Sequence, residues 1–156
     1  MKSIRLSRIV VVADSGHGRD LVAHLRRMEV AKVVAVTGLG EAWRLCQSGG
    51  ADACLVTVDG ALPDGPAAKS DAPGRSCGIP ALIIAPVVTP HLRRTARRCG
   101  YLAAVSATIP PRMLYRRIGA ALQHRRAAGG RPQRLPGRMP FVGPANPAAF
   151  GKPTLH

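Results

Sequence analysis

The sequence predicts an α/β fold, a doubly wound sheet of five parallel strands. Three observations favour this fold. Five short apolar runs, rich in β-branched residues, recur along the chain. The runs do not alternate with polar residues, which is typical of parallel strands covered on both faces. Segments with the apolar spacing of helices lie between most of the runs.

The five apolar runs predict the five strands. In chain order they read RIVVVAD, KVVAVT, ACLVTV, PALIIA and YLAAV. We therefore expect strands at residues 8–14, 32–37, 53–58, 80–85 and 101–105.

Two helices are expected between the first three strands. GRDLVAHLRRM (18–28) and GEAWRLCQ (40–47) each gather their apolar residues on one face. The segment after the third strand is rich in Pro, Gly and Ala, so we expect residues 60–78 to form a loop with at most a short helix around 66–70.

Two further helices follow the fourth and fifth strands. The first has Thr89 as its N-cap, Pro90 as its first helical residue and Gly100 at its end. The second covers residues 111–126, with Met113 among the residues expected on its apolar face.

Composition divides the chain into a folded domain over residues 1–126 and a basic tail over residues 127–156. The tail is rich in Pro and Gly and has no periodicity, so we expect it to be disordered. The formal net charge of the whole chain is +15, and residues 124–156 contain six basic residues and no acidic one. Such a chain should associate with an acidic partner.

Several classes of protein are disfavoured. No apolar run approaches the roughly 20 residues of a membrane span, and the four cysteines show no C-x-x-C pair, so we expect a cytoplasmic protein with buried, reduced thiols. SGHGRD (15–20) contains G-x-G after a strand, but the third glycine of a dinucleotide motif would fall on Leu21. No set of residues suggests catalysis, and we predict that the chain is not an enzyme.

Several segments in sequence resemble one family. They are VVVADS in the first strand, GEAWRL in the second helix, LPDG after the third strand, IPALIIA in the fourth strand, and TARRCGYLAAV and IPPRMLYRRI further on. In order and spacing they resemble the receiver domain of bacterial two-component response regulators, over about residues 7–123. The resemblance implies the flavodoxin-like fold and a role in signal transduction by phosphorelay.

The resemblance also implies where a phosphorylation site would lie. The family's acidic pair falls on Ala13 and Asp14, which leaves one carboxylate as a candidate metal ligand. Its hydroxyl residue falls on Ala85 and its lysine on Ala107. The family's phosphoacceptor Asp falls on Thr57 when counted forward from Asp52, and on Asp59 when counted back from Pro63.

Asp59 is thus the candidate phosphoacceptor, but we interpret it as a remnant. Loss of a metal ligand, a hydroxyl and an ammonium group should cripple phosphotransfer, since Mg²⁺ needs oxygen ligands and the phosphoryl charge needs a cation. We expect no cofactor, or Mg²⁺ only if Asp14 and Asp59 form a residual pocket. The sequence therefore predicts an atypical, phosphorylation-independent receiver domain.

Clustered arginines are the candidate binding residues. They form pairs four residues apart in the last two predicted helices, and no acidic residue accompanies them. The predicted partner-binding residues are Arg93, Arg94, Arg97, Arg98, Arg112, Arg116 and Arg117. The resemblance implies that this face docks a protein such as a histidine kinase or another regulator, or forms a homodimer.

Nucleic acid is the alternative partner. The arginine face and the basic tail could bind phosphates without reading sequence. No helix-turn-helix module follows the domain, however, and the tail lacks the interleaved aromatic residues that stack on bases. We therefore favour a protein–protein interaction module over a nucleic-acid-associated regulator.

Overall fold

The computed structural model describes residues 4–13, 16–60, 62 and 78–129. A short 3₁₀ helix, η1, comes first (Ile4–Leu6). The strands are β1 (Arg8–Val12), β2 (Lys32–Val36), β3 (Ala53–Thr57), β4 (Ala81–Ala85) and β5 (Ala103–Ser106). The helices are α1 (Gly16–Arg27), α2 (Leu39–Gln47), α5 (Pro90–Arg98) and α6 (Pro111–Gly129).

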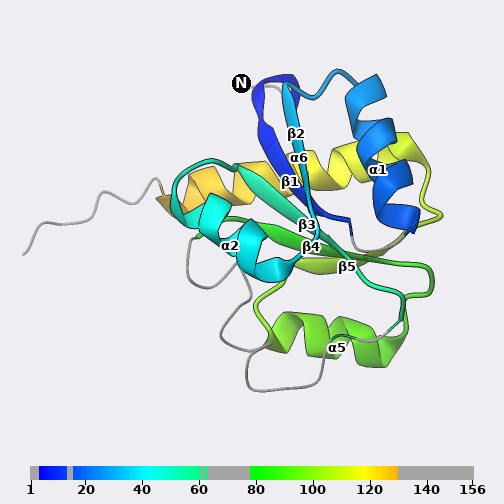
Figure 1. Cartoon of the computed structure of the whole chain (residues 1–156). Coiled ribbons are helices and arrows are strands. Elements are labelled where there is room, and N and C mark those ends of the chain that lie inside the picture. Colours follow the sequence, from blue (N-terminus) through cyan, green and yellow to red (C-terminus); the bar gives the residue numbers. More distant parts are fainter. Residues whose placement is uncertain (1–3, 14–15, 61, 63–77, 130–156) are drawn as a thin grey trace, which may run out of the picture.

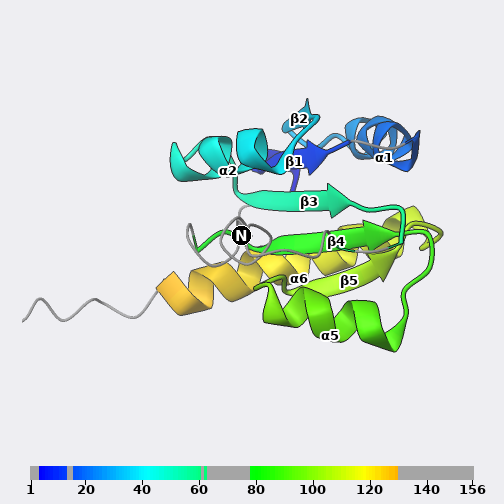
Figure 2. The ribbon, with the colours of Figure 1, turned by 60° about the horizontal axis from the view of Figure 1, so that its bottom comes forward.

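The five strands form one parallel sheet in the order β2-β1-β3-β4-β5. All the strands therefore end at the same edge of the sheet, which we call the carboxyl edge; Figure 2 shows the arrows of β3, β4 and β5 pointing the same way. Helices α1 and α6 lie on one side of the sheet, and α2 and α5 lie on the other (Figure 1).

Each side of the sheet has its own aliphatic core. Alternate residues of a strand point to opposite faces, so Ile9 and Val11 of β1 pack toward α1 and α6, whereas Val10 and Val12 pack toward α2 and α5. The central strands β3 and β4 are buried along their whole length. Helices cover both faces of these strands, which explains why their sequences are apolar without interruption, as the sequence predicted.

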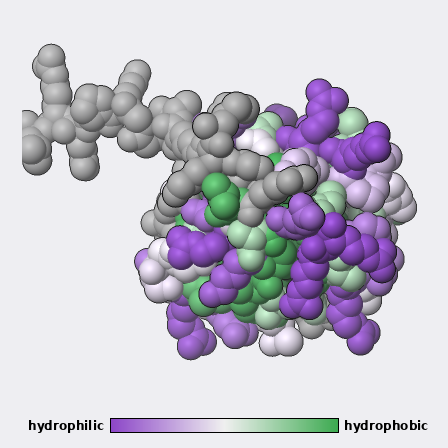
Figure 3. Space-filling model, turned by 90° about the horizontal axis from the view of Figure 1, so that it is seen from above, coloured by the Kyte–Doolittle hydropathy of each residue, from purple (hydrophilic) through white to green (hydrophobic). Residues whose placement is uncertain are grey.

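The two edges of the sheet are less covered. Val33 and Val34 of β2 and Ala103 and Ala104 of β5 are only half-buried. Figure 3 looks down on the end of the molecule where β1 and β2 lie at the top of Figure 1, and it shows a hydrophobic patch among hydrophilic side chains.

The predicted elements are confirmed, with shifts of a few residues at their ends. Thr89 caps α5, because its hydroxyl oxygen accepts a hydrogen bond from the Leu92 N–H at 3.1 Å. Helix α6 runs to Gly129, three residues beyond the predicted boundary at residue 126. Met113 was predicted on the apolar face of this helix, and that prediction is wrong: its side chain is 44% exposed. It lies about 100° around the helix from buried Leu114, outside the apolar stripe.

The predicted thiols are confirmed where they are described. Cys46, Cys54 and Cys99 are thiols buried in the core between the sheet and helices α2 and α5. Cys77, most of the predicted loop at 60–78 and the predicted tail beyond Gly129 lie outside the described residues. Among the described helices, none is both long and apolar enough to cross a lipid bilayer.

Candidate functional site

The carboxyl edge brings Thr57 and Ala13 together. Val12 pairs with Val56 across β1 and β3, so the next residues of the two chains lie side by side. Thr57 is buried, and its Oγ1 donates a hydrogen bond to the Val12 carbonyl oxygen at 2.6 Å. The hydroxyl proton is therefore used within the sheet.

Helix α1 closes over this point. A Cβ added to Gly18 would lie 2.5 Å from Ala13 Cα and 3.0 Å from Thr57 Oγ1. Such distances leave no room for any side chain at position 18. The end of β3, where the sequence placed one of the two alternatives for the phosphoacceptor, is thus packed against helix backbone.

Asp59 lies elsewhere. It follows the end of β3 by two residues and is exposed. The ladder between β3 and β4 continues in register, with the Val58 N–H donating to the Ile84 carbonyl oxygen at 2.9 Å, so no bulge up to Val58 draws Asp59 back toward Ala13. Within the described residues, no hydrogen bond or ion pair involves the Asp59 carboxylate. Asp14 lies outside the described residues.

The other two positions of the expected site carry methyl groups. Ala85 ends β4, and the Ala107 N–H donates to the Ala85 carbonyl oxygen at 2.8 Å. The nearest hydroxyls bond to each other, with Ser106 Oγ 2.8 Å from Thr108 Oγ1. Neither Ala85 nor Ala107 can donate a hydrogen bond from its side chain or supply a charge.

The described residues at these positions do not by themselves fit a Mg²⁺ site. Mg²⁺ favours octahedral oxygen ligands, usually with one or two carboxylates. The described residues at the expected positions on the carboxyl edge are Ala13, Ala85 and Ala107, whose methyl groups cannot bind a metal ion, and Thr57, which offers an uncharged hydroxyl in place of a carboxylate. Among the described residues there is no group of three His, Cys, Asp or Glu side chains that could hold a metal ion.

The four arginines of α5 surround its solvent side. Leu92 and Ala96 are the buried residues of the helix, and all four arginines are exposed. At about 100° per residue, Arg93 and Arg97 lie on one flank, and Arg94 and Arg98 lie on the side opposite the core. We call these four residues the α5 arginine cluster.

The three arginines of α6 do not share one direction. Leu114 and Ile118 face the core. With about 100° per residue, Arg117 lies beside this apolar stripe, and Arg112 and Arg116 lie on the side of the helix away from it. Arg112 and Arg116 line a pocket with Tyr115 and with Met28, which follows α1.

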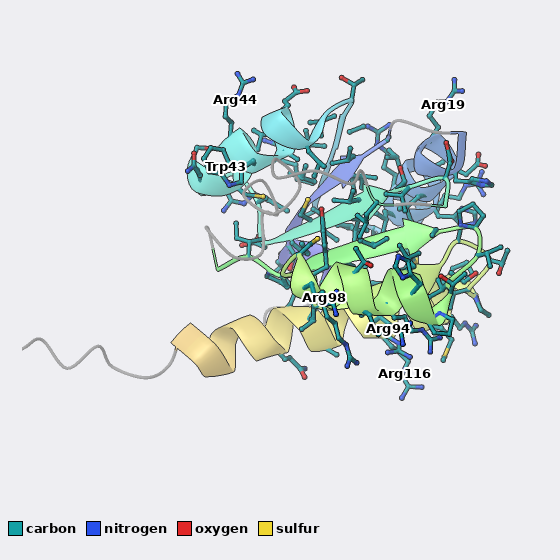
Figure 4. All side chains as sticks on the ribbon, turned by 90° about the horizontal axis from the view of Figure 1, so that it is seen from below. Arg19, Trp43, Arg44, Arg94, Arg98 and Arg116 are labelled. Atoms are coloured by element: carbon teal, nitrogen blue, oxygen red, sulfur yellow. The ribbon has the colours of Figure 1, made fainter. Side chains whose placement is uncertain are left out.

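Even so, exposed arginines of both α5 and α6 lie on one side of the molecule. Figure 4 shows Arg94 and Arg98 of α5 and Arg116 of α6 along the same side, opposite Arg19 of α1 and Arg44 of α2. Every Asp and Glu of the sequence precedes residue 72, so neither α5 nor α6 contains an acidic residue. The seven arginines that the sequence singled out are thus exposed, but they divide into the α5 cluster, a pocket pair and Arg117.

Two features of this geometry were missed from the sequence. The close contact at Gly18 had a signal, since a glycine at the start of a predicted helix can allow close approach of backbone, but the glycines of SGHGRD were interpreted only in terms of a dinucleotide motif. The pocket between Met28 and α6 had no local signal, because Met28 is more than 80 positions away in sequence from the α6 residues that line it.

Solved structures share this fold at low sequence identity. A CheY-like receiver domain protein from Methanospirillum hungatei is 20% identical with a TM-score of 0.60, over 80% of this chain and 99% of that chain. A LuxR-family two-component response regulator from Aurantimonas is 22% identical with a TM-score of 0.62, over 76% and 86%. A protein from Burkholderia pseudomallei described as pilus assembly-related is 13% identical with a TM-score of 0.66, over 79% and 94%.

No family model matches the sequence. A comparison with curated proteins also finds no match. The strand order, the parallel sheet and the structural neighbours agree with one another, and they show that this chain has the flavodoxin-like fold of response-regulator receiver domains.

Proposed function

We propose that this chain is an atypical receiver domain of two-component signalling that works by binding a protein partner and does not depend on phosphorylation. Its fold is that of receiver domains. Ala13, Ala85 and Ala107 stand where the family resemblance places a carboxylate, a hydroxyl and a lysine. Without these groups, contact surfaces must carry the function, which we place in the cytoplasm.

The observation that carries the proposal is the α5 arginine cluster. Four exposed guanidinium groups on a helix of nine residues, with no acidic residue on α5 or α6, form an unneutralised basic surface. Charge complementarity speeds association and selects partners. The partner that fits is an acidic protein surface, and we propose a histidine kinase or another regulator.

Phosphorylation is tested directly with acetyl phosphate and Mg²⁺, followed by intact-mass measurement. We expect no stoichiometric addition of a phosphoryl group. A mass gain that is absent in Asp59→Asn would show that Asp59 is a working phosphoacceptor, and the proposal of phosphorylation-independent action would then be wrong.

Partner binding is tested by charge reversal in the α5 arginine cluster. Arg94→Glu combined with Arg97→Glu should abolish capture of the protein's partner from its native cells and leave the fold unchanged, because both side chains are exposed. Arg26→Glu combined with Arg27→Glu changes the charge equally on exposed positions of α1 and is the matched control. Equal capture by both double variants would remove the α5 cluster from the interface.

Nucleic acid remains the second candidate, because pairs of arginines one helical turn apart also suit a phosphate backbone. A salt titration separates the two candidates. Binding to DNA through several arginines should weaken steeply as salt rises, since condensed counterions are released. Failure to bind DNA at physiological salt would exclude this candidate and leave the protein partner.

A further inference from the structure

A pocket lies between the end of α1 and the first two turns of α6. Its volume is about 420 Å³, and the described residues that line it are Met28, Arg112, Tyr115 and Arg116. Pockets that hold small molecules range from about 300 to 1,000 Å³. It contains neither the residues of the carboxyl edge nor the α5 arginine cluster, so it is a separate site.

One wall of the pocket is positively charged. Arg112 and Arg116 are one helical turn apart, and both side chains are exposed. No carboxylate among the described residues forms an ion pair with either of them, and the first turn of α6 has no acidic residue. Glu29 follows Met28 in the sequence but does not line the pocket. Two guanidinium groups so placed can share the oxygens of one phosphate through charge-assisted hydrogen bonds.

The other walls are apolar. Met28 and Tyr115 are half-buried and pack against the core between the sheet and helices α1 and α6. Each is therefore held in place on one side and open to a ligand on the other. A phenol ring and a thioether form a surface on which a flat ring packs well.

We propose that this pocket binds a small organic phosphate, free in solution, that carries a flat apolar ring. The phosphate lies between Arg112 and Arg116, and the ring packs against Tyr115 and Met28. A phosphate without a ring uses only the charged wall, and a ring without a phosphate uses only the apolar walls. Both parts together are needed for selective binding.

Three probes are suitable. Phenyl phosphate carries both the ring and the phosphate, inorganic phosphate carries only the phosphate, and phenol carries only the ring. Methyl NMR of the full chain labelled at its methionines reports the location. Phenyl phosphate should shift the methyl resonance of Met28, assigned through Met28→Leu. The resonance of Met113 should shift less, because Met113 does not line the pocket.

Matched double variants test the charged wall. Arg112→Gln combined with Arg116→Gln should weaken binding of phenyl phosphate about tenfold or more, as expected for the loss of a charge-assisted contact. Arg93→Gln combined with Arg97→Gln removes an equivalent exposed pair from α5 and should leave affinity unchanged. Tyr115→Ala should abolish the preference for phenyl phosphate over inorganic phosphate.

Three outcomes would overturn the proposal. Equal weakening in the two double variants, or equal shifts of Met28 and Met113, would mean general attraction by a basic surface. Absence of binding at millimolar phenyl phosphate would mean that there is no site. A phosphotyrosine peptide that binds about tenfold more tightly than phenyl phosphate would identify a partner's side chain, and not a free molecule, as the ligand.

Discussion

Of the described glycines, Gly18 at the carboxyl edge has the least room for a side chain. Its Cα lies against the backbone of Ala13 and the hydroxyl of Thr57, where even a methyl group would overlap. The residue therefore lets α1 lie close against the ends of β1 and β3. This contact lies at Ala13 and Thr57, two of the positions to which the resemblance points for phosphorylation chemistry.

Adding a single methyl group at position 18 tests this close packing. Gly18→Ala should lower the free energy of unfolding by about 2 kcal/mol, because overpacking against backbone outweighs the gain in helix propensity. Gly40→Ala, in the first turn of α2 with no atom within 4 Å of the added Cβ, should raise it by up to about 1 kcal/mol. Urea denaturation measures both; two changes of the same sign would contradict the packing at Gly18.

Tyr101 makes stability depend on pH. Burial, together with the nearby thiols of Cys54 and Cys99, raises the pKa of its phenol well above the ordinary value. The folded protein therefore keeps a proton that the unfolded chain releases near pH 10. From about pH 10 upward, the free energy of unfolding should fall by about 1.4 kcal/mol per pH unit.

The comparison for this effect is between two Tyr→Phe variants. Tyr101→Phe should lack this slope, whereas Tyr115→Phe, at a half-buried position, should keep it. Urea unfolding between about pH 9 and 11.5 measures the slope. An undiminished slope in Tyr101→Phe would assign the proton to another group.

At the level of the elements, three helices end in the same way. In α1, α2 and α5 a backbone N–H two residues past the C-cap returns to a carbonyl in the last turn: Val30 to Leu25, Gly50 to Leu45 and Tyr101 to Ala96. This is the Schellman motif, in which the residue just before the one that donates this N–H has a positive φ. Gly49 and Gly100 fill that position in α2 and α5, but Glu29, with φ of 56°, fills it in α1.

Glycine should therefore suit position 29 better than alanine does. A residue with a side chain destabilises the folded state by about 1–2 kcal/mol when its backbone is in the left-handed region. Glycine avoids this cost, but its greater conformational entropy in the unfolded chain offsets part of the gain. Glu29→Gly should thus be more stable than Glu29→Ala by about 0.5–1 kcal/mol. Both variants remove the carboxylate, so their difference in thermal or urea unfolding isolates the backbone. Equal stability would mean that α1 does not end in this motif.

For the whole molecule, charge is the dominant feature. The chain has a formal net charge of +15, and Arg93–Arg97, Arg94–Arg98 and Arg112–Arg116 are pairs of like charge one helical turn apart. Each such pair costs about 0.2–0.5 kcal/mol. A surface of this kind repels a second copy of itself, so an acidic partner is favoured over the homodimer that the resemblance also implies for this face.

Salt should consequently stabilise the folded protein. Raising NaCl from about 20 to 200 mM screens the like charges and should raise the free energy of unfolding by roughly 0.5–1 kcal/mol. In Arg93→Gln combined with Arg98→Gln, which removes one charge from each pair of α5, the gain should shrink. Stability that is unchanged or lowered by salt would contradict self-repulsion as the cause.

The fold was predictable because its signals are local. Each strand is an unbroken apolar run, and Thr89 with Pro90 marks the start of α5 by the chemistry of a helix cap. The end of α6 was less predictable, because Ala127 and Ala128 are good helix formers and only the glycines that follow disfavour the helix. The assignment of Ala13, Ala85 and Ala107 to three of the family's positions also follows from sequence order alone.

The geometry of the sites depended on the tertiary structure. Sequence spacing left Thr57 and Asp59 as alternatives, because both fit one face of an extended strand; the pairing of Val56 with Val12 is what places Thr57 beside Ala13. Likewise, the position of Arg112 and Arg116 beside Met28 depends on how α6 lies across the sheet. Sequence determined the elements, since periodicity and capping act between near neighbours. Only the tertiary structure decided which distant residues meet, because those contacts depend on how all the elements pack together around the core.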